Sequence, residues 1–245
     1  MTVRGGGAEL RTAELVALLS LATDLGMGQP MEHAQRTCLL GLKLADDLSL
    51  DDSERAVVYY VCLLAWVGCH ADSFEMASLV GDDIAARAGA YEYEFVGLDL
   101  LRFLARYLGA GGSPLERARA FGSFVVSGWR TVEEFDATHC AAAGDFALRL
   151  GLGPEVRDAL QHSFERWDGK GKPAGLRGEE LTLAARIVQL ADLAVACTGS
   201  AESGARSRLR GGAAARSSIP TSSTASAGSR RSPCPSSMRR RRGRR

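Results

Sequence analysis

The sequence predicts an all-α fold, a helical bundle with a disordered basic C-terminal tail. Apolar residues recur at helical spacing through most of the first 200 residues, and several of these segments begin with helix-capping sequences. No segment shows the sustained alternation of polar and apolar residues, separated by hairpin turns, that exposed strands require. We therefore expect about eight to ten helices before the tail.

The first three helices are expected in close succession. Two of them cover residues 9–24 and 31–48, because their leucines recur every three to four positions. A third begins at Asp51 and Glu54, which form a capping box, and runs to about Gly68.

Two further helix starts follow the same logic. Asp72 and Glu75 repeat the capping pattern and predict a helix over 73–88. Ser113 followed by Pro114 combines an N-cap residue with a proline at the first helical position.

The last three helices complete the body. Thr131 and Glu134 are expected to begin one, and Pro154 begins another that ends at Arg166. The final helix covers 180–199, after which the composition changes.

The charge is distributed unevenly. The whole chain has a net charge of +1, but the segment 203–245 contains twelve arginines and no acidic residue. Residues 1–202 therefore carry a charge of −11. An acidic surface disfavours phosphate contacts, so nucleic acid is expected to contact only the basic tail.

The tail has two possible interpretations. Its Ser, Arg, Ala, Gly and Pro content cannot bury enough apolar surface to order the chain, so disorder is expected from residue 203 onward. It could be a tether for nucleic acid or anionic lipid. It could also result from a frameshift in a GC-rich gene, and the nucleotide sequence would show whether another frame continues the helical pattern.

Cysteine usage and hydropathy indicate the compartment. The six cysteines form no CxxC pair, and most lie in apolar helical patterns, which is typical of reduced proteins. The apolar run 15–22 is too short to span a bilayer. It could mimic a signal peptide, but acidic residues lie close to it, and we expect a cytoplasmic protein without a membrane span.

The stretch 162–192 is the most informative. It reads HSFERWDGKGKPAGLRGEELTLAARIVQLAD, a helix end, a glycine-rich loop and an apolar helix. It resembles the signature of HD-GYP domains, bacterial metal-dependent phosphohydrolases that cleave cyclic di-GMP, which reads roughly HHERxDGxGYPxGLxGxxIxxxARIxxxAD. The positions in register are Glu165, Arg166, Asp168, Gly169, Gly171, Pro173, Gly175, Leu176, Gly178, Ala185, Arg186, Ile187, Ala191 and Asp192.

Several positions depart from the family pattern. Ser163 and Phe164 replace its histidine pair, and Lys172 replaces the tyrosine of GYP. Ala65 and Trp66 lie where the family has an adjacent His-Asp pair. Tryptophan cannot ligate a metal, so we expect Trp66 to fill that part of the site.

The resemblance implies an HD-domain-like helical bundle and a metal site with a reduced set of ligands. In such enzymes clustered divalent ions activate water and neutralise the phosphate, with imidazole and carboxylate ligands. The surviving matches are His33, His139 and Asp192, and His70 and Asp72 are weaker substitutes. If the site is active, the implied cofactor is divalent Fe, Mn or Zn; otherwise there is none. Each of these residues could instead be structural, His70 as a cation at a helix C-terminus.

Glu165 and Asp168 are candidates for general acid and base. The alternative is that Glu165 forms an ion pair and Asp168 caps the loop, which we favour. The loop residues Lys170, Gly171, Lys172 and Pro173 could bind an anionic phosphate, or could form a solvated loop.

Two functions remain open. One is a degenerate HD-GYP-like module that senses, binds or dimerises without hydrolysis; the other is an active phosphohydrolase acting on cyclic di-GMP or a related nucleotide. The lost ligand positions favour the first. The chain is also similar to HD-GYP-like domains that precede LuxR-type helix-turn-helix domains, although no such motif follows residue 203. Expected partners are a cyclic dinucleotide and a second copy of the chain or a regulatory protein.

Overall fold

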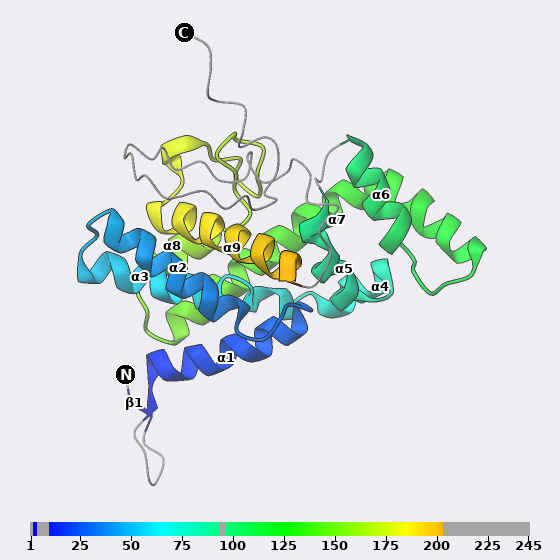
Figure 1. The fold of residues 1–245 in the computed structure, drawn as a ribbon. Helices are drawn as coiled ribbons and strands as arrows, with labels where there is room; N and C mark the ends of the chain where they lie inside the picture. The colour runs from blue at the N-terminus through cyan, green and yellow to red at the C-terminus, as the bar shows by residue number, and fades with distance from the viewer. Residues whose placement is uncertain (1, 4–9, 94–96, 203–245) are drawn as a thin grey trace.

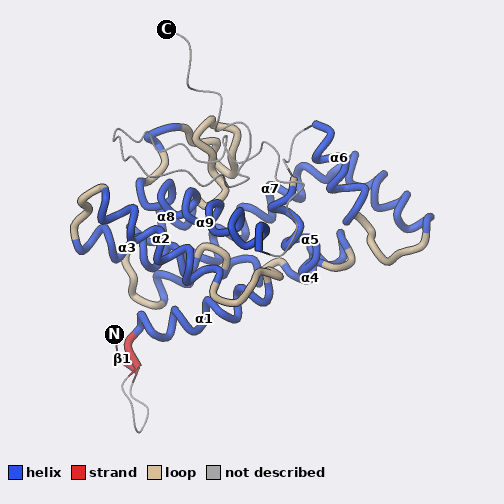
Figure 2. Tube along the Cα trace, in the orientation of Figure 1, coloured by secondary structure: helices blue, strands red, loops and turns tan. Residues whose placement is uncertain are grey.

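The computed structural model describes residues 2–3, 10–93 and 97–202, and in these ranges nine α-helices and three short 3-10 helices form an all-α body (Figures 1 and 2). A two-residue antiparallel pair, β1 (Thr2–Val3) and β2 (Leu10–Arg11), precedes the first helix. The all-α prediction is confirmed. The helices are α1 (Thr12–Gly26), α2 (His33–Asp47), α3 (Asp52–Leu64), η1 (Val67–His70), α4 (Ser73–Val80), α5 (Asp83–Gly89), η2 (Ala90–Glu92), α6 (Gly97–Tyr107), α7 (Pro114–Arg149), α8 (Pro154–Gln161), η3 (Gly178–Glu180) and α9 (Leu183–Glu202).

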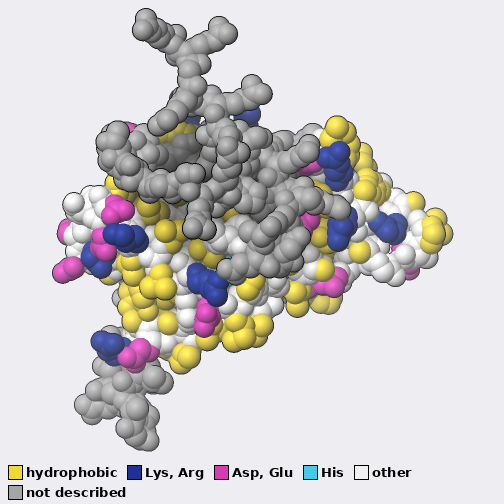
Figure 3. All heavy atoms as spheres, viewed as in Figure 1, with side chains coloured by type: hydrophobic (Ala, Val, Ile, Leu, Met, Phe, Trp, Pro, Cys, Tyr) yellow, Lys and Arg dark blue, Asp and Glu magenta, His cyan; other side chains and the backbone are white. Residues whose placement is uncertain are grey.

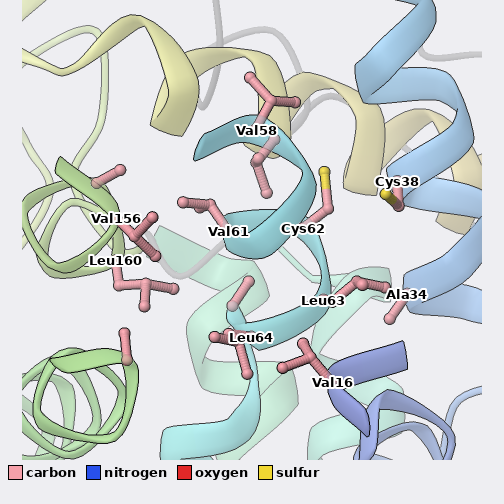
Figure 4. Close-up of a cluster of buried hydrophobic side chains, with 14 of the residues drawn as sticks. Val16, Ala34, Cys38, Val58, Val61, Cys62, Leu63, Leu64, Val156 and Leu160 are labelled. Atoms are coloured by element: carbon pink, nitrogen blue, oxygen red, sulfur yellow. The ribbon is translucent and has the colours of Figure 1, made fainter. Parts of the chain in front are cut away.

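Helix α3 lies at the centre of the main core, between α2, α8 and α9 (Figure 4). Its side chains Val58, Val61 and Leu64 are almost completely buried. Gly41 of α2 lets that helix approach closely, since a Cβ there would lie 2.9 Å from the Sγ atom of Cys62. This packing places the start of α2 beside α9, where the candidate site lies.

The expected helix over 73–88 is divided in two. Gly81 adopts a φ of +85°, a left-handed conformation that ends α4, and the Asp82 side chain accepts a hydrogen bond from the backbone N–H of Ala85 to begin α5. The prediction missed this break because the capping residues at 72 and 75 gave no information about the far end.

Two other predicted boundaries are wrong. Helix α7 continues from Pro114 through Thr131 to Arg149, so Thr131 does not begin a helix. Helix α8 ends at Gln161 rather than at Arg166, and the following residues form the turn that leads into the glycine-rich loop.

The predicted tail, 203–245, lies outside the described residues, so the boundary at 202 stays a prediction. Among the described helices, none alone is both long and apolar enough to cross a bilayer. Asp52–His70 and Ser73–Val80, bent by 61°, pass that test only as a pair and only by length and composition.

Candidate functional site

The candidate site centres on the Asp192 carboxylate, which accepts three side-chain hydrogen bonds. Its Oδ1 lies 2.9 Å from Nε2 of His33 and 3.1 Å from Nε1 of Trp66. Its Oδ2 accepts a bond of 3.0 Å from the hydroxyl of Tyr91. Residues more than 150 positions apart therefore meet here, as the matches of His33 and Asp192 to the family imply.

The end of α1 fixes the start of α2 at this point. The Asp24 carboxylate accepts the backbone N–H of Ala34 at 3.1 Å, which caps the helix that begins with His33. Burial raises the pKa of Asp24. Burial opposes the charged form of His33, but the bond to Asp192 and the charges of Asp192 and Asp24 outweigh it and raise the pKa of His33.

His139 of α7 has both ring nitrogens engaged elsewhere. Its Nε2 lies 2.7 Å from the carbonyl oxygen of Ala65, and its Nδ1 lies 3.2 Å from Sγ of Cys69. A carbonyl can only accept, so Nε2–H donates and Nδ1 of the neutral ring accepts from the thiol. Burial lowers the pKa of His139 to about 4.

An aromatic group fills the space between these residues. The ring of Trp66 lies 5.9 Å from that of Phe164, 6.1 Å from that of His139 and 6.4 Å from that of Tyr91, centroid to centroid. Phe164 lies 4.7 Å from the His139 ring. Trp66 and Phe164, at positions where the resemblance implies metal ligands, thus pack against each other.

The residues present do not fit a binuclear metal centre. Within the described ranges, no three His, Cys, Asp or Glu side chains are placed to hold one ion together. Asp192 is hydrogen-bonded through both oxygens, and His139 through both nitrogens. Ser163 donates its hydroxyl to the Leu160 carbonyl, and Phe164 carries no ligand atom.

The two proposed substitutes lie in other contacts. His70 is exposed at the end of η1, with Nδ1 3.3 Å from the carbonyl oxygen of Val67. Asp72 is buried and pairs with Arg87 at 2.9 Å. A buried ion pair that loses one partner leaves an uncompensated charge, so Asp72 is poorly placed to move to a metal.

Glu165 organises the glycine-rich loop. It is only 2% exposed, and its carboxylate accepts backbone N–H groups from Ala174 at 2.6 Å, Gly175 at 3.1 Å and Leu176 at 2.8 Å. Asp168 lies near the surface and pairs with Arg166 at 2.7 Å. The Arg166 guanidinium is the main reason that the pKa of Asp168 falls to about 2. Both carboxylates are thus engaged in local structure.

The loop residues named as a binding candidate differ in exposure, since Gly171 is buried and the other three are exposed. Gly171 packs against the chain, since a Cβ there would lie 2.3 Å from the backbone nitrogen of Arg166. Lys172 donates its ammonium group to Glu133 of α7 at 2.7 Å, while Lys170 is exposed and Pro173 follows a cis peptide bond. Lys172 is therefore held by Glu133, whereas Lys170 is accessible to solvent.

Sequence reasoning missed Tyr91 and Gln189. Tyr91 lies in η2, in a segment without a matching motif, so no local pattern could identify it. The Gln189 amide donates to the carbonyl oxygens of His162 and Glu165 at 2.9 and 3.0 Å, and so holds the turn after α8 against α9. Gln189 lies inside the stretch 162–192 that resembles the family signature. A polar residue on a largely buried helix was the signal that could have identified it.

The fold should shift the pKa values of the two site histidines in opposite directions. An unfolded imidazole protonates near pH 6.5, whereas folded His139 does so near pH 4, so its contribution to stability is lost as the pH falls from about 6.5 to about 4. His33 has a raised pKa, so its contribution is present below about 6.5 and is lost as the pH rises through the folded value. Nitrogen NMR of the imidazoles at about pH 5.5 should find His33 charged and His139 neutral. A charged His139 at that pH would contradict the buried geometry.

Comparison with known proteins supports a relation to one group of enzymes. No family model matches the chain. The 3′3′-cGAMP-specific phosphodiesterase 3 of Vibrio cholerae serotype O1 is 28% identical over 185 residues, which cover 74% of this chain and 40% of that protein. The crystal structure of the cyclic GMP-AMP-specific phosphodiesterase V-cGAP3 of V. cholerae superposes with a TM-score of 0.50 at 25% identity, covering 80% of this chain and 44% of that one. The chain thus spans less than half of the relative's length. These similarities relate the chain to the HD-GYP phosphodiesterases of the HD superfamily.

Proposed function

We propose that this chain is an HD-GYP-like signalling domain that has lost phosphodiester hydrolysis and acts as a sensory or regulatory module. The observation that carries the proposal is the Asp192 carboxylate, which accepts hydrogen bonds from His33, Trp66 and Tyr91. An indole N–H and a phenol O–H at this carboxylate satisfy it without a metal.

The replaced positions support the same proposal. Clustered divalent ions need lone pairs of carboxylate and imidazole directed at a common point. Here Trp66 and Phe164 place aromatic carbon where the resemblance implies ligand atoms. A metal would have to displace this packing and also break the hydrogen bonds of Asp192.

An active phosphohydrolase is the second candidate. His33 and Asp192 do lie together, and the V. cholerae relative is named as a phosphodiesterase. That function requires His139 to exchange the Cys69 thiol at Nδ1 for a metal, and His70 or Asp72 to leave their present contacts.

Hydrolysis assays separate the two candidates. Full-length protein should not cleave 3′3′-cGAMP or cyclic di-GMP above a blank that contains Mn²⁺, Fe²⁺ or Zn²⁺ without protein. Turnover that is lost in His139→Ala would overturn the proposal and establish the enzyme.

Binding tests the regulatory part of the proposal. We propose that a cyclic dinucleotide contacts the glycine-rich loop through the exposed Lys170. Equilibrium dialysis with 3′3′-cGAMP should show binding that Lys170→Ala weakens about fivefold, because one point charge beside a phosphate is lost. Lys43→Ala is the matched control, since Lys43 is an exposed lysine on α2 paired with Asp47. Equal affinities of the two variants would exclude the loop.

A further inference from the structure

The first half of α7 carries an exposed apolar stripe. Its inner side packs on α6 through Phe124, which lies with Leu104 and Leu108 in a small core. On the other side Val125 is 75% exposed and Val126 is 87% exposed. Large apolar side chains gathered on one helix face are typical of a surface that binds another protein.

The spacing of this stripe is that of a helix–helix seam. Leu115, 61% exposed, Gly122 and Val126 are separated by seven and four residues, so they share one side of α7, with Val125 beside them. A Cβ built on Gly122 meets nothing within 4 Å, so the helix offers a shallow point there for close approach. Figure 1 shows α6 and this part of α7 extending from the bundle, and Figure 3 shows hydrophobic side chains on the surface at that end.

The charges along the seam select the partner and its direction. Arg119 and Glu133 are exposed, lie seven residues before and after Val126, and therefore share its side of the helix. A second α7 running antiparallel, centred on Val126, brings Arg119 of each copy beside Glu133 of the other. A parallel pair would instead bring each charge beside the same charge of the other copy, Arg119 beside Arg119 and Glu133 beside Glu133.

We propose that a second copy of this chain docks on this face, with the two α7 helices antiparallel and Val126 at the two-fold axis. Glu133 also accepts Lys172 through Oε1, and a carboxylate has a second oxygen for Arg119 of the other copy. In this register Leu115 of one copy meets Ala137 of the other, so the contact runs about 33 Å along each α7 helix. The inference is independent of whether the domain hydrolyses a nucleotide.

Cysteine cross-linking of the full chain tests this register. V126C should form an intermolecular disulfide with itself under mild oxidation, because the two positions face each other across the axis. L115C and A137C should not cross-link alone but should cross-link when mixed. The unsubstituted chain controls for the native cysteines. Self-cross-linking of L115C, or none of V126C, would overturn the antiparallel register.

Sedimentation equilibrium gives the second readout. The unsubstituted chain should be dimeric, and Val126→Glu should raise the dimer dissociation constant at least about tenfold by placing two like charges at the axis. Ala141→Glu, at an exposed position of α7 beyond the seam, should leave it unchanged. Ala141→Glu should keep the melting temperature of the parent chain, and Val126→Glu should remain folded, since both side chains are exposed. A monomeric parent chain at tens of micromolar would overturn the proposal.

Discussion

Replacing Asp192 with alanine should lower the free energy of unfolding by about 3–5 kcal/mol. The carboxylate accepts three side-chain bonds, and its removal takes away the acceptor that His33, Trp66 and Tyr91 share next to the core. Urea unfolding followed by circular dichroism measures the change.

Asp47→Ala is the matched control, because Asp47 is an exposed helical aspartate that pairs only with Lys43 among the contacts described. It should change the free energy of unfolding by less than about 1 kcal/mol. Asp192→Asn should fall between the two, since the amide keeps one accepting oxygen. A loss for Asp192→Ala no larger than for Asp47→Ala would show that the three hydrogen bonds do not hold the site together.

Replacing Glu165 with alanine should disorder the glycine-rich loop and lower the free energy of unfolding by about 2–4 kcal/mol. One buried carboxylate accepts the N–H groups of Ala174, Gly175 and Leu176, and alanine leaves these three donors without it. Hydrogen exchange should therefore become markedly faster at those three amides.

Glu180→Ala controls for this variant. Glu180 also accepts a backbone N–H, that of Arg177 at 2.9 Å, but the bond is exposed. The control should cost less than about 1 kcal/mol and leave exchange at 174–176 unchanged. Unchanged exchange in Glu165→Ala would contradict the structural role and would restore Glu165 as a candidate acid or base.

The fold could be predicted where the determinants are local. The capping box at Asp51 and the Ser113–Pro114 start are both present, because these side chains bond to their own first turn. The prediction of a helix start at Thr131 was wrong because a capping sequence is also compatible with a helix interior, and Gly128, three residues earlier, lies within the continuous helix α7. The break at Gly81 depends on packing instead, since its N–H bonds Ala77 while a Cβ there would lie 2.2 Å from the Ala110 carbonyl oxygen.

The site could be predicted only in part, because several of its contacts depend on tertiary packing rather than on local sequence. The family pattern implies His33 and Asp192 as ligands of one site, and the structure brings them together. It also predicts that Trp66 fills the site, and Trp66 packs on Phe164 there. Tyr91 completes the Asp192 cluster from a segment with no motif, so only the tertiary arrangement reveals it. His139 is implied as a ligand by the resemblance, but its neighbours Ala65 and Cys69 decide its hydrogen bonds.

Metal content per chain tests the central claim most directly. The full-length protein, produced with iron, manganese and zinc available, should contain well under one tightly bound ion per chain by elemental analysis. This result is expected because Asp192 is satisfied by His33, Trp66 and Tyr91. One or more ions per chain, lost in both His33→Ala and His139→Ala, would contradict the account and support a metal-dependent phosphohydrolase.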